Sequence, residues 1–94
     1  MARLAFPPGA LRDLDRLADF LLEHSPADAA ATGPLIASAL RVLEQHPLIG
    51  RPAEAGLREL LISRGRTGYV ALYRYDPATD TALVLAIRHQ REGR

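Results

Sequence analysis

Three segments in the C-terminal half carry apolar residues at consecutive positions, so both faces of the sheet that they form would be apolar. The segments are residues 57–63, 69–75 and 81–89, joined by turn-forming stretches at 64–68 and 76–80. Successive side chains of a strand point to opposite faces, and an antiparallel sheet with one wet face alternates apolar and polar residues. These segments largely do not alternate, so both faces of the sheet need a cover.

The N-terminal half predicts a short strand and two helices that supply one such cover. Residues 3–6 form an apolar run that two prolines stop, which favours an opening strand. Leucines and alanines then recur at helical spacing over residues 11–22. A second helix is expected to begin at Ser25 and Pro26, where the serine hydroxyl can cap free amides, and to end near His46.

The predicted fold class is α+β, in the order β-α-α-β-β-β, with a helical hairpin packed on an antiparallel sheet. Since 94 residues leave room for one core, residues 1–94 are expected to form one domain. Residues 47–56 contain turn formers at close intervals and predict an ordered connector. Gly33 and Pro34 interrupt the second helix, so a kink or a break is expected there.

The second face of the sheet is the main open question. Two consecutive helices with a short connection usually pack on the same side of a sheet, which leaves the opposite face for a partner. Two alternatives remain: the helices take opposite faces, or a homodimer buries the uncovered face. The sequence does not separate these arrangements.

Composition argues against several kinds of chemistry. The chain has no cysteine, and its three histidines lack the spacing of metal ligands, so no metal site and no cofactor is predicted. Neither a phosphate-binding glycine loop nor a nucleophile motif is present. A secretion signal and an apolar run of membrane-spanning length are also lacking, which predicts a cytoplasmic protein.

All 12 basic residues are arginines. The planar guanidinium suits phosphate and carboxylate, although a genome rich in arginine codons explains the bias more simply. The positions of the arginines in the fold are therefore more informative than their number. If the first hairpin pairs Ser63 with Tyr69, Arg58 lies across from Arg74, and two like charges there suggest a bound anion, a partner's carboxylate or a nearby glutamate of this chain.

If Ser63 pairs with Tyr69 and Tyr75 pairs with Thr81, three apolar side chains lie together as a strip on one face of the sheet. Leu60, Leu72 and Val84 form this strip, which is expected to contact a protein partner. Basic residues gather around the first turn and the tail. They form a candidate anion-binding cluster, although solvated surface is the simpler interpretation of any one of them: Arg64, Arg66, Arg88, His89 and Arg91.

Four spaced stretches carry a family resemblance: His46-Pro47-Leu48-Ile49-Gly50-Arg51-Pro52, Leu57-Arg58-Glu59-Leu60, Gly68-Tyr69-Val70-Ala71-Leu72-Tyr73-Arg74 and Ile87-Arg88-His89-Gln90. With the leading strand and helices in the same order, they resemble the RelE/ParE superfamily of toxins, and ParE most closely. The resemblance spans essentially the whole chain. It implies the toxin of a type II toxin-antitoxin system, as in growth arrest and plasmid stabilisation.

The resemblance also implies partners. A cognate antitoxin, expected to be a DNA-binding autorepressor, would lay an extended and helical segment over the sheet and helices, with contacts at Leu60, Leu72 and Val84. ParE-like members inhibit DNA gyrase without known catalysis, whereas RelE-like members cut messenger RNA on the ribosome with basic residues and a tyrosine near the C-terminus. This chain has no lysine, and its three tyrosines lie in the middle strand. A gyrase inhibitor that is not an enzyme is therefore preferred, with the RelE-like endoribonuclease as the alternative.

Basic residues are expected to bind the target. The predicted set is Arg58, Arg74, Arg88, His89 and Arg91, followed by Arg51, which has the alternative role of fastening the connector. In the nuclease alternative, Arg58, Arg74, His89 and Arg91 hold and cleave the phosphodiester. Gly33 and Pro34 depart from the uninterrupted second helix that the family normally has.

Overall fold

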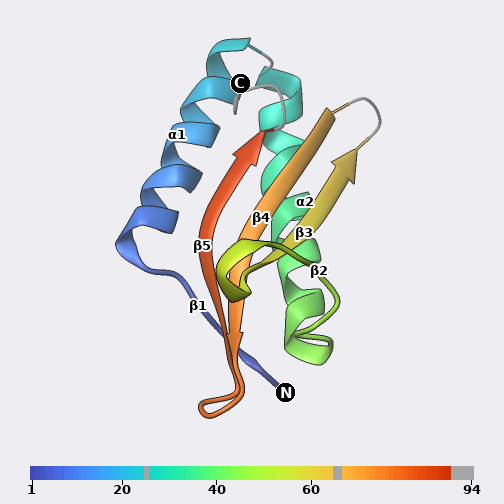
Figure 1. The fold of residues 1–94 in the computed structure, drawn as a ribbon. Coiled ribbons are helices and arrows are strands. Elements are labelled where there is room, and N and C mark those ends of the chain that lie inside the picture. Colours follow the sequence, from blue (N-terminus) through green and yellow to red (C-terminus); the bar gives the residue numbers. More distant parts are fainter. Residues whose placement is uncertain (25, 65–66, 90–94) are drawn as a thin grey trace.

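The computed structural model describes residues 1–24, 26–64 and 67–89. Its elements, shown in Figure 1, are β1 (Arg3–Ala5), α1 (Pro8–His24), α2 (Pro26–Gln45), β2 (Arg51–Pro52), a 3-10 turn (Glu54–Gly56), β3 (Arg58–Arg64), β4 (Thr67–Asp76) and β5 (Thr81–His89). The predicted order of strand, two helices and three strands is confirmed. β2 is an additional short strand within the stretch predicted as a connector.

The five strands form one mixed sheet in the order β1-β5-β4-β3-β2. β3, β4 and β5 make the predicted antiparallel meander, whereas β1 pairs with β5 in parallel. β2 adds to the outer edge of β3 over two residue pairs. The edges of the sheet are thus its shortest strands, which limits the unpaired backbone offered to other chains.

Both helices pack on the same face of the sheet. Leu17 and Leu21 of α1 and Leu40 of α2 share one buried cluster with Tyr69 and Ile87 of the sheet. In Figure 1, α1 runs beside β5 while α2 crosses behind β4 and β3. The hypothesis of a shared face is confirmed, so the opposite face has no cover from the described part of the chain.

The pairing of β3 with β4 differs by one residue from the predicted register. Ser63 lies opposite Gly68, and Arg58 lies opposite Tyr73 rather than Arg74. The cause is the shorter turn, because β3 continues to Arg64 and β4 begins at Thr67. A one-residue slip exchanges the faces of one strand relative to the other, so the proposed pair of facing arginines does not exist.

The pairing of β4 with β5 contains a bulge that alternation alone does not predict. Leu72 faces Ala86 and Tyr73 faces Val84, so Leu85 is an extra residue on β5. The predicted pairing of Tyr75 with Thr81 is wrong, because Tyr75 faces Ala82. A bulge changes the phase of a strand, and Val84 and Ile87 therefore both point into the core, where each is fully buried.

The helix α2 runs through Gly33 and Pro34 as one element, so the expected break is absent. Pro34 has no amide hydrogen, and the carbonyl of Ala30 loses the donor that position 34 normally supplies. Packing compensates, because Ile36, Leu40 and Leu43 are all buried against the sheet after the proline. Tertiary contacts thus override the local preference.

A carboxylate of α1 covers part of the free edge of β5. β1 pairs with β5 only as far as Leu83, so the amide of Ile87 lies beyond the end of β1. That amide donates a hydrogen bond to Oδ2 of Asp13 at 3.4 Å. Because an unpaired buried amide is costly, this contact helps to fix α1 along the sheet edge.

The register makes a prediction about two neighbouring residues of β3. Ile62 is 2% exposed in the core, whereas Leu61 is 48% exposed on the opposite face. We expect Ile62→Ala to lower the free energy of unfolding by about 2–5 kcal/mol, because it leaves a cavity. Leu61→Ala should cost less than about 1 kcal/mol. Urea denaturation of both variants measures the difference, and equal losses would contradict the observed register.

Candidate partner-binding surfaces

The sheet face opposite the helices, here called the open face, is apolar at its centre. Its position follows from the register, because the residues that alternate with it, such as Ala71 and Tyr73, are buried under the helices. Leu61 is its most exposed large apolar side chain, and the others are partly exposed. The centre of the open face consists of Leu61, Val70, Leu72, Leu83 and Ala86.

Two of the predicted target-binding arginines lie on the open face with free side chains. Arg88 pairs in the backbone ladder with Val70, and Arg74 pairs with Leu83, so the two lie in different rows of this face. Both side chains are exposed, and neither has a hydrogen-bonding or ionic partner in the described part of the chain. They are available to a carboxylate or phosphate of a partner.

Arg51 and Glu59 neutralise each other at the side of the open face. Nε of Arg51 lies 3.1 Å from Oε1 of Glu59, and the two residues are directly paired between β2 and β3. This contact favours the alternative role of Arg51, which is to fasten the connector. It also places a carboxylate on the open face, where Glu59 pairs with Leu72.

Arg58 is bound to the connector. Its Nη1 donates to the carbonyl oxygens of Leu48 at 3.1 Å and Gly50 at 2.7 Å. The hydroxyl of Tyr73 donates to the carbonyl of Pro47 at 2.7 Å and accepts from the amide of Gly50 at 2.9 Å. Four hydrogen bonds therefore hold residues 47–50 against β3 and β4.

Gly50 is the close contact in this connector. A Cβ at Gly50 would lie 2.6 Å from Cε1 and 2.7 Å from the hydroxyl of Tyr73, and 2.9 Å from the carbonyl oxygen of Glu59. Such distances are below any normal contact, so glycine is required for the backbone to approach Tyr73. Much of the first stretch that carried the family resemblance, residues 46–52, is therefore explained by this structural contact.

The three tyrosines are all engaged in hydrogen bonds. Tyr69 is buried, and its hydroxyl lies 3.3 Å from Oγ1 of Thr32. The hydroxyl of Tyr75 donates to Oδ1 of Asp80 at 2.6 Å. That hydrogen bond to Asp80 raises the pKa of Tyr75 above 10.0, since it stabilises the protonated phenol. With Tyr73 bound to the connector, none of the three is poised to exchange a proton with a partner.

The residues predicted to contact an antitoxin are divided between the two faces. Leu72 lies on the open face, as expected. Val84 is fully buried beneath the helices, and Leu60 packs against the same core. A one-residue slip in each hairpin explains both: Ser63 pairs with Gly68 rather than Tyr69, which moves Leu60, and Thr81 pairs with Asp76 rather than Tyr75, which moves Val84. The Arg64, Arg66, His89 and Arg91 side chains lie outside the described residues.

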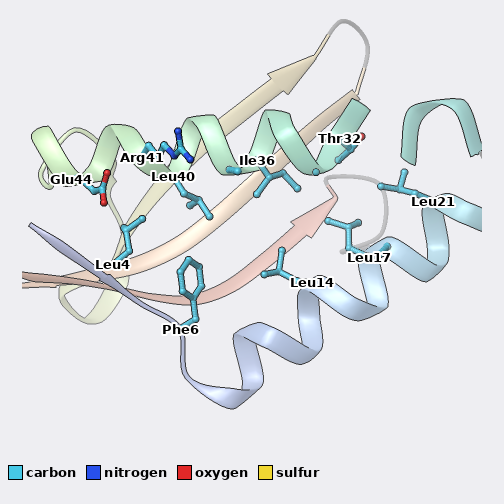
Figure 2. A pocket seen from close by; sticks show the side chains of 13 residues that line it. Leu4, Phe6, Leu14, Leu17, Leu21, Thr32, Ile36, Leu40, Arg41 and Glu44 are labelled. Atoms are coloured by element: carbon cyan, nitrogen blue, oxygen red, sulfur yellow. The ribbon is translucent and has the colours of Figure 1, made fainter. Parts of the chain in front are cut away.

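An apolar groove, called here the helix groove, lies between α1 and α2 and was not predicted. Its volume is about 410 Å³, and Figure 2 shows its walls converging over β5. Thr32 lies near one end, whereas Arg41 and Glu44 lie at the other. The apolar stripes of both helices are visible in the sequence, but their separation is a tertiary property. The groove is lined mainly by Phe6, Leu14, Leu17, Leu21, Ile36 and Leu40.

The described residues contain no group of three or more histidine, cysteine, aspartate or glutamate side chains that could hold a metal ion. Neither helix, as far as it is described, is long and apolar enough to cross a bilayer. The candidate surfaces are therefore the open face and the helix groove.

Solved structures define the class of this fold. A chain of the chromosomal ParDE toxin-antitoxin system from P. aeruginosa superposes with a TM-score of 0.74 at 26% identity, covering 93% of this chain and 94% of that one. A chain of the RelBE2 toxin-antitoxin complex from Mycobacterium tuberculosis gives 0.60 at 28% identity, covering 95% and 98%. The helical hairpin on its sheet is thus the fold of RelE/ParE toxins.

The sequence comparisons identify the family. Residues 4–93 match the model of the ParE toxin of type II toxin-antitoxin systems, parDE, and the chain belongs to this family of toxins. It is 38% identical to Toxin RelE3 of Caulobacter vibrioides over the full length of both chains. It is also 42% identical to Toxin RelE1 of the same organism over 65 residues, which cover 69% of this chain and 70% of that protein.

The hydrogen bonds of the connector predict that two tyrosine hydroxyls contribute unequally to the free energy of unfolding. Tyr73→Phe leaves the amide of Gly50 and the carbonyl of Pro47 without their buried partner, so we expect a loss of about 1–3 kcal/mol in unfolding free energy. Tyr75→Phe removes an exposed hydrogen bond and should cost less than about 1 kcal/mol. Chemical denaturation tests the pair. Equal stabilities would mean that the connector is not held through Tyr73.

Proposed function

We propose that this toxin acts by binding a protein target, DNA gyrase, as ParE-like toxins do, and that it is not itself a nuclease. The observation that carries the proposal is the chemistry of the open face. Its centre is aliphatic, and Arg74 and Arg88 are the described free cations on its strands β3–β5. An apolar centre with few charges at its margin is typical of protein interfaces.

Three observations argue against RNA cleavage on this face. The ion pair of Arg51 with Glu59 commits a cation beside the apolar centre to a carboxylate of this chain, so that pair adds no net positive charge for a phosphate backbone. Arg58 is committed to the carbonyls of Leu48 and Gly50. The tyrosine hydroxyls are engaged as described, so a general acid or base is lacking among them.

The names of the relatives favour a second candidate, a RelE-like ribosome-dependent endoribonuclease. Toxin RelE3 and Toxin RelE1 both carry the RelE name. In that case Arg74 would hold the phosphodiester together with His89 and Arg91, and Arg58 would have to leave its carbonyl partners. The need for that rearrangement is why the gyrase proposal is preferred.

A cognate antitoxin is proposed to neutralise the toxin by covering its apolar surfaces. The similar solved chains come from a toxin-antitoxin system and a toxin-antitoxin complex, which supports such a partner. An extended segment fits the open face, and a helix fits the helix groove. We further propose that residues 1–94 act as one domain in the cytoplasm, and that the antitoxin is a DNA-binding autorepressor.

The target is tested with purified toxin in a gyrase supercoiling assay. We expect wild-type toxin to inhibit supercoiling, and Arg74→Ala and Arg88→Ala each to raise the inhibitory concentration about tenfold or more, the effect of losing a charged hydrogen bond. Arg12→Ala, on an exposed position of α1, should inhibit like the wild type. Intact gyrase activity together with cleavage of ribosome-bound messenger RNA would establish the second candidate instead.

The open face is tested separately as an antitoxin surface. Leu72→Asp should weaken antitoxin binding at least tenfold, because an unpaired carboxylate is buried in the interface. Leu22→Asp is the matched control, since Leu22 is 60% exposed on α1 and does not line the helix groove. Isothermal titration calorimetry with the antitoxin measures both. Unchanged affinity of the Leu72 variant would remove this face from the antitoxin interface.

A further inference from the structure

The helix groove carries its charges at one end. Its α1 side is lined by leucines and an alanine, whereas the two charged residues among its described lining, Arg41 and Glu44, both come from α2. Figure 2 shows them at the end opposite Thr32. Arg41 is exposed and Glu44 is half-buried. A partner that fills the groove would therefore cover these two charges together with the apolar walls.

The two charges do not neutralise each other. Residues three apart on a helix are neighbours, and such a pair can form a salt bridge. Arg41 and Glu44 nevertheless form no ion pair, and neither side chain has a polar partner in the described part of the chain. Arginine before glutamate is also the less favourable order for a pair along a helix. Both side chains are thus available to a partner.

Glu44 lies at an end of α2 that already carries negative charge. The helix ends at Gln45, and its last turn contains no basic residue. The carbonyl end of a helix has a partial negative charge, to which the carboxylate of Glu44 adds. The amide of Ala2 donates to the carbonyl oxygen of Glu44 at 2.8 Å, which ties this turn to the residue before β1. A fixed negative centre therefore closes this end of the groove, with a separate positive charge at Arg41 one turn earlier.

The shape of the groove indicates a helical occupant. Its α2 wall extends from Thr32 to Glu44, about 18 Å at the rise of an α-helix, which is room for about three turns. Apolar residues line the groove between these ends. Because burying an unpaired charge is costly, a helix that covers this surface must bring opposite charges to Glu44 and Arg41. An amphipathic helix with both signs of charge near one end of its apolar stripe meets this requirement.

We infer that Arg41 and Glu44 are specificity-determining residues for the antitoxin: the cognate antitoxin lays an amphipathic helix in the helix groove, with a basic residue at Glu44 and an acidic residue at Arg41. This inference rests on the proposed binding of an antitoxin. A helix with the charges reversed would bring like charges together in a partly desolvated interface, which costs affinity. The two residues thus discriminate between partner helices that are equally apolar.

The test uses the full-length toxin and the protein encoded by the reading frame beside its gene, with isothermal titration calorimetry as the measurement. We expect Glu44→Lys to raise the dissociation constant at least tenfold, because it brings like charges together. Glu44→Gln removes the charge without reversing it and should have a smaller effect. Glu23→Lys is the matched control, because it makes the same change of charge at an exposed position of α1 that does not line the groove; it should bind within twofold of wild type.

A double reversal shows which charges meet in the complex. If Arg41 and Glu44 bind charges of the antitoxin, Arg41→Glu combined with Glu44→Lys should bind more weakly than either single variant. If the two residues instead pair with each other once covered, the double variant keeps that pair and should recover wild-type affinity, which would overturn the inference. Exchanging each basic residue of the antitoxin for glutamate in turn should, at one position, restore binding to Glu44→Lys.

Folding and toxicity separate this effect from a general defect. Glu44→Lys places a cation at the C-terminal end of α2, which the helix dipole favours, so thermal unfolding should show no loss of stability. In cells, the variant should arrest growth like the wild type but resist neutralisation by co-expressed antitoxin. Arg41→Glu, at an exposed position, tests the same charge arrangement independently of Glu44.

The outcomes distinguish this inference from the proposed function. If wild type, Arg41→Glu and Glu44→Lys bind the antitoxin equally, the role of the two charges is wrong while the antitoxin proposal stands. If no exchange of a basic residue in the antitoxin restores binding to Glu44→Lys, the partner charge at Glu44 is wrong. If wild-type toxin does not bind the neighbouring protein at all, both are wrong.

Discussion

The structure depends on the burial of one sheet face beneath both helices. Leucines of α1 and α2 meet Tyr69, Tyr73, Val84 and Ile87 in a single core. Because two helices are used on this side, the described chain has no element left for the other side. The same packing separates α1 from α2 far enough to leave a groove between them. Two apolar surfaces on a small toxin are thus consequences of one packing arrangement, and each is suited to a partner.

The connector shows how a distinctive motif can be structural. Arg58 and Tyr73 donate to carbonyls of residues 47–50, and Gly50 permits their approach. Arginine is also a residue type that binds phosphate, so the sequence alone placed Arg58 in a target site. Its hydrogen bonds place it instead, with Tyr73, in the support of the sheet edge. The cations that stay available, Arg74 and Arg88, are distinguished by their lack of such partners.

Much of the fold was predictable, because helical spacing, prolines and turn formers mark the elements directly. The packing of both helices on one face also followed from their short connection. Face assignment within the sheet was less accessible, since a one-residue change of register at the turn of a hairpin reverses every side chain of one strand relative to the other. Thr81 pairs with Asp76 rather than Tyr75, and this slip is why Val84 was assigned to a surface. The bulge at Leu85, which lies beyond Val84, has no local signature in an apolar strand. The helix groove depends on how far apart the two helices pack, and the sequence pattern of neither helix specifies that distance.

The bulge on β5 also affects the shape of the surface that a partner meets. An extra residue in one strand bends that strand and increases the local twist. The open face is therefore curved across β4 and β5, near Leu72 and Ala86. A rod-shaped partner can follow a curved sheet diagonally, whereas a flat protein surface would touch it over a small area. Curvature thus limits the shapes of molecule that this toxin can accept, independently of any charge or side chain on its surface.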